Sequence, residues 1–242
     1  MFTRTESFRD FIRLYPIVSF IVTIHLGLYL LTSLPIFPNN WFFENLSGVN
    51  LYIMEGEYWR LITPTFMHSG FSHALFNSFS LVLFGPALER MLGSGRFLFI
   101  YLLSGIIANV ATLLLEPLTY THVGSSGAIF GLFGYYLAMI MFRKHMLSKQ
   151  NSQIILTLCV VSLIMTFLQP NINITAHLFG LLGGFLLGAI PYFNKKDLSD
   201  SIQGTANWAS NRKKSISYQS PWKILIWAAI IIIAIIGLLA QK

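Results

Sequence analysis

The stretch GSSGAIFGLFG, residues 124–134, decides how this chain folds, because it joins a glycine-serine turn to an apolar tract. It continues into YYLAMIMF, residues 135–142, which carries no charged side chain. Gly127, Gly131 and Gly134 share one helical face, and small-residue faces let membrane helices approach closely. A Gly-x-Ser-Gly turn can also present a nucleophilic serine. The stretch therefore predicts a packing motif, a reactive site, or both.

The composition around this stretch is that of a membrane protein. Of the 242 residues, 55% are hydrophobic and 10% are charged, whereas soluble domains carry about 25% charged residues. The formal net charge of +7 is attributed to basic loops at a membrane, and no nucleic-acid partner is expected. The single cysteine, Cys159, excludes an internal disulfide and a cysteine-based metal site. No metal or organic cofactor is expected.

Apolar segments long enough to cross a bilayer, about 20 residues each, recur along the chain. They predict an all-α polytopic bundle of six helices with one further helix near the C-terminus. The domains expected from this pattern are a tail over 1–15, a core over 16–193, a polar connector over 194–223 and a seventh helix with its tail over 224–242. The individual spans are placed at 16–34, 71–88, 97–115, 126–142, 154–168, 174–193 and 224–240.

The basic residues predict the orientation. Fourteen of the sixteen Lys and Arg residues fall in the N-terminal tail, in alternate loops and in the connector, whereas Arg60 and Lys242 fall on the other side. Cytoplasmic loops carry an excess of Lys and Arg. We therefore expect a cytoplasmic N-terminus.

Four polar residues within the predicted spans are candidates for a functional site, because polar groups there are costly and usually functional. His73 and Asn77, four residues apart, share one face of the second span. Ser126 begins the fourth span and His177 lies near the start of the sixth. Because alternate spans run in the same direction, all four residues are expected at a similar depth, toward the outer face.

The glycines allow the fourth and sixth spans to touch. Gly127 and Gly131 on one span face Gly180 and Gly184 on the other, and such faces permit close backbone approach. A serine and an imidazole could then meet within hydrogen-bond reach, which is the arrangement of an activated nucleophile.

No acidic residue lies inside these two spans, so a Ser-His dyad is expected in place of a triad, with Glu116 left open as a third member. Phe130, one turn after Ser126, is expected to stack on the imidazole. The N–H at the helix start, Asn77 and His73 are the expected oxyanion donors.

Several motifs resemble those of the rhomboid intramembrane serine proteases. GSSG from Gly124 resembles the Gly-x-Ser-Gly motif of that family. HSGFSHALFN from His68 resembles its His-x-x-x-x-His-x-x-x-Asn motif, and HLFGLLGG from His177 resembles His-x-x-Gly-x-x-x-Gly. Trp59 and Arg60 resemble the Trp-Arg pair of the family's first loop. The resemblance covers about residues 16–193.

The resemblance implies an intramembrane serine endopeptidase that cuts in or near transmembrane segments of client proteins. It implies Ser126 as the nucleophile, His177 as the general base, and His73 and Asn77 as oxyanion donors. The expected partners are single-span or other transmembrane substrates and the lipid bilayer, in a bacterial cell membrane.

Other interpretations remain at this stage. Ser126 alone could be a helix cap, and His73 and Asn77 could bond neighbouring helices. A haem-binding bundle could use facing histidines, although it would leave the GSSG turn unexplained. A rhomboid-like protein that binds membrane clients without cutting them is the main alternative, although both the serine and the histidine are present. His25, within the first span, is expected to be structural.

Overall fold

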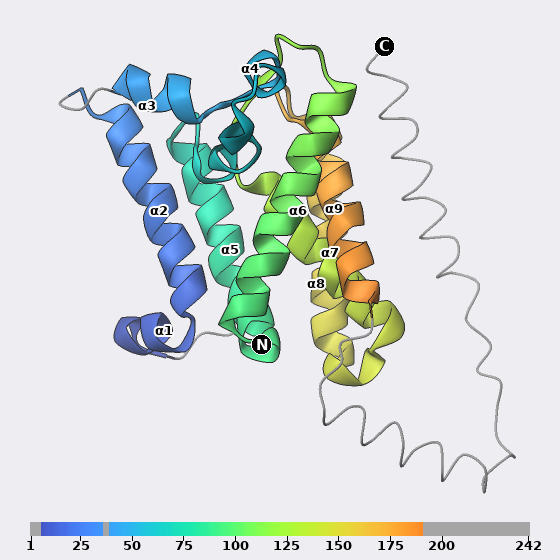
Figure 1. The fold of residues 1–242 in the computed structure, drawn as a ribbon. Coiled ribbons are helices and arrows are strands. Elements are labelled where there is room, and N and C mark those ends of the chain that lie inside the picture. Colours follow the sequence, from blue (N-terminus) through green and yellow to red (C-terminus); the bar gives the residue numbers. More distant parts are fainter. Residues whose placement is uncertain (1–5, 36–38, 191–242) are drawn as a thin grey trace, which may run out of the picture. The chain divides into compact units, whose positions relative to one another are not determined.

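The computed structural model describes residues 6–35 and 39–190, which form a bundle of helices (Figure 1). The long helices are α2 (Pro16–Ser33), α5 (Phe71–Leu92), α6 (Ser94–Leu115), α7 (Ser126–Phe142), α8 (Lys149–Leu168) and α9 (Ile174–Ala189). The short elements are α1 (Phe8–Leu14), α3 (Asn39–Leu46), α4 (Asn50–Met54), η1 (Tyr58–Leu61), η2 (Thr63–Phe66), η3 (Lys144–Met146) and the antiparallel pair β1 (Gly48–Val49) and β2 (Thr121–His122).

The first six predicted spans are confirmed as helices, with shifted ends. Helix α8 begins at Lys149, five residues before its predicted start, because Ser148 caps its polar first turn by accepting a hydrogen bond from Asn151 N at 3.2 Å. Helix α9 ends at Ala189, ahead of Pro191 in the sequence, as expected because a residue before proline disfavours helix. The connector and the seventh span lie outside the described residues.

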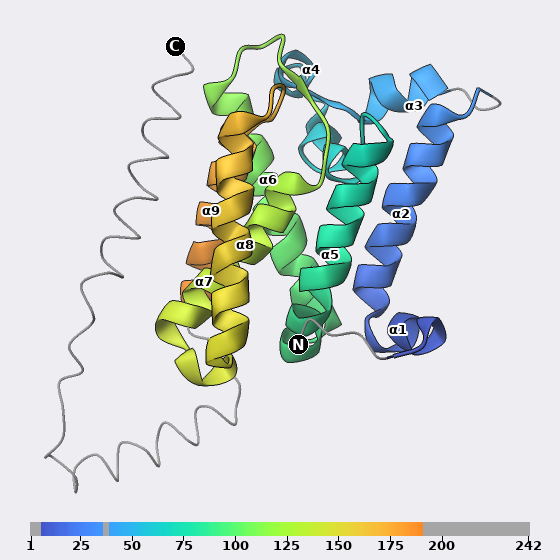
Figure 2. The same ribbon diagram turned by 180° about the vertical axis from the view of Figure 1, so that it is seen from behind.

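Helices α2, α5, α6 and α8 are each long and apolar enough to cross a membrane, and α7 and α9 are shorter apolar helices. The chain is therefore an all-α polytopic membrane protein. Helix α7 is buried along nearly its whole length. It lies among α6, α8 and α9, as the two opposite views show (Figures 1 and 2).

Contact between α7 and α9 is a backbone contact made by glycines. A Cβ atom on Gly180 would collide with the carbonyl of Gly127, and one on Gly184 would collide with the carbonyl of Gly131. On the opposite side, a Cβ on Gly127 would lie 2.7 Å from Ala108 Cβ of α6. The small-residue faces therefore bring three helices together where larger side chains would hold them apart.

Buried polar side chains attach α2 to the rest of the bundle. Glu89 is 2% exposed, and its carboxylate accepts hydrogen bonds from Ile17 N at 2.9 Å and Val18 N at 3.0 Å. It thereby satisfies two of the free N–H groups in the first turn of α2, where a negative charge is also favoured by the helix dipole. Near the middle of α2, the buried His25 ring lies 3.4 Å from Ser78 Oγ and 3.3 Å from Tyr101 Oη, which agrees with the predicted structural role.

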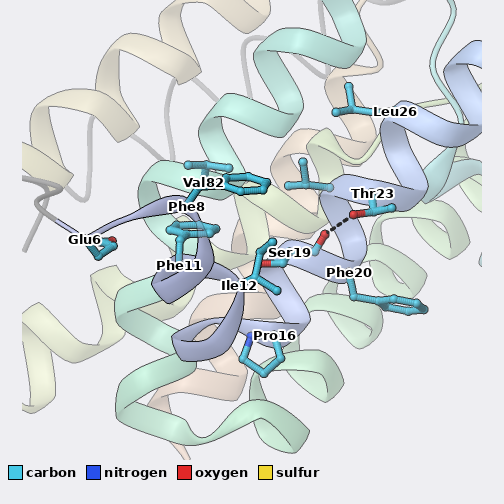
Figure 3. Close-up of a pocket in the computed structure, with 11 residues that line it drawn as sticks. Glu6, Phe8, Phe11, Ile12, Pro16, Ser19, Phe20, Thr23, Leu26 and Val82 are labelled. Carbon is cyan, nitrogen blue, oxygen red and sulfur yellow. Dashed lines mark hydrogen bonds between the residues drawn. The ribbon is translucent and has the colours of Figure 1, made fainter.

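The N-terminal segment forms one side of an apolar groove of about 630 Å³ between α1, α2 and Val82 of α5 (Figure 3). The hydroxyl proton of Thr23 is engaged within α2, where it donates to Ser19 O at 2.8 Å. Among the described residues that line the groove, Glu6 is the one titratable residue, and they include none of the predicted site residues. The predicted site residues line a different cavity of the bundle.

The glycine contact leads to a first prediction. Gly180→Ala should lower the free energy of unfolding by about 1–3 kcal/mol, because the added methyl group overpacks the α7–α9 contact. Gly27→Ala in α2 is the matched control, since a Cβ there meets nothing within 4 Å. Thermal unfolding in detergent measures both variants. Equal melting temperatures for Gly180→Ala and wild type would contradict the packing described here.

Candidate active site

The four predicted site residues line one cavity of about 860 Å³. Ser126 is the first residue of α7, His177 lies in the first turn of α9, and His73 and Asn77 lie in the first two turns of α5. The cavity wall also includes residues of α8 and of the segment around β2. The tertiary structure thus brings together residues that are far apart in the sequence, from His73 to His177.

The turn before Ser126 requires glycine at position 124. Gly124 has a φ angle of +126°, which side-chain-bearing residues rarely adopt. A Cβ there would also lie 2.6 Å from His73 Nε2 and 3.8 Å from Asn77 Nδ2. The backbone entering α7 therefore passes directly beside the two side chains predicted to donate hydrogen bonds.

The His177 ring is held from two directions. Phe130 stacks on its face, with ring centroids 4.2 Å apart and an interplanar angle of 18°, which confirms the predicted stacking. At the ring edge, Thr166 Oγ1 of α8 lies 2.8 Å from His177 Nδ1. With one nitrogen engaged by Thr166, Nε2 is the ring nitrogen left to act on a partner in the cavity.

Glu116, left open as a third member of a triad, has a different role. Its carboxylate accepts a hydrogen bond from Thr175 Oγ1 at 2.6 Å. At the same end of α9, Asn173 Oδ1 accepts a hydrogen bond from Ala176 N at 2.8 Å. Glu116 therefore helps to position the start of α9, and Thr166 occupies the place at Nδ1 that an acidic residue fills in a Ser-His-Asp triad.

His73 is also oriented by a neighbouring hydroxyl. Ser69 Oγ lies 3.2 Å from His73 Nδ1, one helical turn earlier. His68 packs edge-on against His73, with ring centroids 5.0 Å apart, and lies equally edge-on to His25 at 4.7 Å. If Ser69 donates to Nδ1, His73 carries its proton on Nε2, the nitrogen next to Gly124.

The first loop holds the turn that precedes Ser126. Arg60 is 3% exposed and donates to Glu44 O and Ser47 O, each at 2.7 Å, so it fixes the loop around a buried guanidinium. Gly124 N in turn donates to Pro64 O of η2 at 2.9 Å, and β1 pairs with β2 just upstream. The Trp-Arg segment therefore supports the site without lining the cavity.

Two cavity residues were missed by sequence reasoning. In the sequence, Thr166 cannot be told from other membrane-helix threonines that donate to a carbonyl one turn earlier, as it does to Ser162 O. Only the tertiary structure places its hydroxyl against His177. His122 lies in β2 and lines the cavity. Burial lowers the pKa of His122 to about 4, so the ring is neutral at pH 7. Its position two residues before Gly124 was a signal available in the sequence.

Comparison with known proteins identifies the family of this chain. The Rhomboid domain matches residues 55–192, and the chain belongs to the rhomboid family. It is 54% identical to YdcA of Bacillus subtilis (strain 168) over 187 residues, covering 77% of this chain and 94% of YdcA.

Two other relatives are longer proteins. Rhomboid protease GluP of the same bacterium is 40% identical over 140 residues, which cover 58% of this chain and 27% of GluP. RHOMBOID-like protein 1 of Arabidopsis thaliana is 26% identical over 197 residues, which cover 78% of this chain and 48% of that protein. The chain thus spans about a quarter to a half of these two relatives.

Stacking at His177 leads to a second prediction. Phe130→Leu should slow modification of Ser126 by a serine-directed fluorophosphonate about two- to tenfold, because an aromatic pair contributes about 0.5–1.5 kcal/mol. Phe130→Tyr, which keeps the ring, should react at nearly the wild-type rate. Labelling per folded molecule measures both. Unchanged labelling of Phe130→Leu would mean that stacking does not orient the imidazole.

Proposed function

We propose that this chain is an intramembrane serine endopeptidase that works with a Ser126–His177 dyad. The observation that carries the proposal is that Ser126, His177, His73 and Asn77 line one cavity. Ser126 begins a helix there, and Thr166 lies within hydrogen-bond distance of His177 Nδ1. The name of GluP, rhomboid protease, supports the same activity class. The non-proteolytic alternative is not favoured, because both dyad residues are present.

In the proposed reaction, Ser126 Oγ attacks a peptide carbonyl of a client protein while His177 Nε2 takes the hydroxyl proton. His177 then returns that proton to the leaving amine, and water hydrolyses the acyl-enzyme. The carbonyl oxygen acquires negative charge in the tetrahedral intermediate. Asn77 Nδ2, His73 Nε2 and the N–H of Ser126 are the proposed donors to that oxygen.

The position of Ser126 at the start of α7 and the size of the cavity both favour the proposed reaction. The Ser126 N–H belongs to the first turn of α7, where backbone donors have no partner within the helix and the dipole favours negative charge. The cavity, at about 860 Å³, has room for several water molecules as well as an unwound peptide segment. We propose transmembrane proteins, single-span or other, as substrates, because a site among apolar helices meets clients within the bilayer.

The proposed location is a bacterial cell membrane, with the N-terminus in the cytoplasm and the active site toward the outer face. Its support is the excess of Lys and Arg in alternate loops. Domain limits of 16–193 for the catalytic core and 224–242 for a seventh helix with its tail remain part of the proposal.

The nucleophile has a direct test. Ser126→Ala should abolish cleavage of a model single-span substrate and all fluorophosphonate labelling, a loss of several orders of magnitude in rate. Ser125→Ala is the matched control, since it removes the adjacent hydroxyl and leaves Ser126 in place. Mass spectrometry of the labelled protein identifies the modified residue. Full cleavage by Ser126→Ala would disprove the proposed mechanism.

The oxyanion role of Asn77 has a separate test. Asn77→Ala should lower kcat with little change in KM, because an oxyanion donor acts mainly in the transition state. One such donor contributes about 10²–10³ in kcat elsewhere, and a smaller loss is expected here since His73 and a backbone N–H remain. Ser78→Ala, on the same helix but bonded to His25, should leave kcat unchanged. If KM rose while kcat held, Asn77 would instead position substrate.

A further inference from the structure

Thr166 stands in a position that constrains which nitrogen of His177 carries a proton. Its hydroxyl makes two hydrogen bonds, one to Ser162 O at 2.9 Å and one to His177 Nδ1 at 2.8 Å. A hydroxyl has a single proton to donate. The Ser162 carbonyl can only accept, so Thr166 donates there, and the second bond is complete only if Nδ1–H donates to Thr166 Oγ1.

From this hydrogen-bond count, we propose that Thr166 is the positioning residue that fixes His177 in the Nδ1–H tautomer and leaves the Nε2 lone pair free to act as the base. The inference rests on the proposed function, since it assigns the orienting group of that same dyad. Thr166 does not touch the reacting atoms and acts through the imidazole.

The burial of the pair strengthens the constraint. Thr166 is 2% exposed and His177 is 7% exposed, so little water reaches the bond to substitute for the threonine oxygen. Phe130 fixes the plane of the ring by stacking, and a hydrogen bond at Nδ1 fixes its rotation within that plane. Together, the two contacts determine where Nε2 points.

Threonine at this position also avoids the desolvation cost of a carboxylate buried at the same depth. A buried carboxylate loses its hydration and is costly within a membrane protein. The threonine oxygen is neutral, yet its lone pair faces Nδ1–H and stabilises the imidazolium that forms when Nε2 takes the serine proton. The dyad therefore gains an orienting acceptor without burying a charge.

The position of Thr166 on α8 explains how the bond is held. Its buried neighbours on that helix are Ile155, Cys159 and Leu163, which recur at helical spacing and form one stripe ending at Thr166. The residues between them, such as Val161 and Ile164, are exposed. Helix α8 therefore packs through a single stripe, and Thr166 is the polar end of that stripe.

Kinetics of two matched variants test the proposal. Thr166→Val keeps the side-chain volume and removes the hydroxyl that accepts from His177. It should lower kcat about tenfold, the order expected for the loss of a buried hydrogen bond, and should leave KM within about twofold of the wild-type value. Thr166→Ser keeps the hydroxyl and should restore kcat to within about threefold of wild type. A Thr166→Val enzyme with unchanged kcat, or equal losses in the Ser and Val variants, would overturn the positioning role.

A spectroscopic readout separates this inference from the proposed function, because it needs no activity. The measurement is the ¹⁵N chemical shift of the ring nitrogens in protein labelled with ¹⁵N-histidine. The signals of His177 are identified as those lost in the His177→Gln variant. Their shifts should show a protonated Nδ1 and an unprotonated Nε2. Thr166→Val should shift the ring toward the Nε2–H form. A wild-type ring already protonated on Nε2 would overturn the inference, whereas failure of Ser126→Ala to abolish cleavage would overturn the dyad alone.

Discussion

The backbone contact between α7 and α9 is the constraint on which the rest of this structure depends. Gly127 follows Ser126 directly, and Gly180 lies one turn beyond His177, so the glycine contact brings the two residues of the proposed dyad toward each other. Helices that carry ordinary side chains pack 8–10 Å apart. Removing the side chains at the crossing brings the backbones closer, and the proposed serine-histidine contact requires that close approach.

Three charged residues, Glu89, Glu116 and Arg60, serve architecture, whereas the described lining of the cavity includes no Asp, Glu, Lys or Arg. Glu89 satisfies N–H groups at the start of α2, and Glu116 holds Thr175 at the start of α9. Arg60 organises the first loop by donating to backbone carbonyls. Each charge meets hydrogen-bonding partners, which limits the cost of its burial. The cavity itself then relies on imidazole, amide and hydroxyl groups, whose burial costs less.

Three separate supports converge on the site. The first loop holds the turn at Gly124, the α9 cap network holds the start of that helix, and α8 contributes Thr166. None of these supports belongs to the sequence motifs around Ser126 and His177. A dyad has no acidic residue to orient its base, so orientation must come from such surrounding contacts, here the Phe130 ring and the Thr166 hydroxyl.

The sequence by itself determined the helical membrane fold, because apolar runs of bilayer length and glycines at helical spacing leave few other solutions. It also singled out Ser126, His177, His73 and Asn77, since polar side chains within apolar spans stand out against their surroundings. Only the tertiary structure decided the partners of Thr166, Glu116 and His122. Each is an ordinary residue in its local sequence, and its role depends on a partner between 11 and 74 positions away. Local patterns report which face of a helix is apolar, but they carry no information about which distant hydroxyl or carboxylate that face will meet.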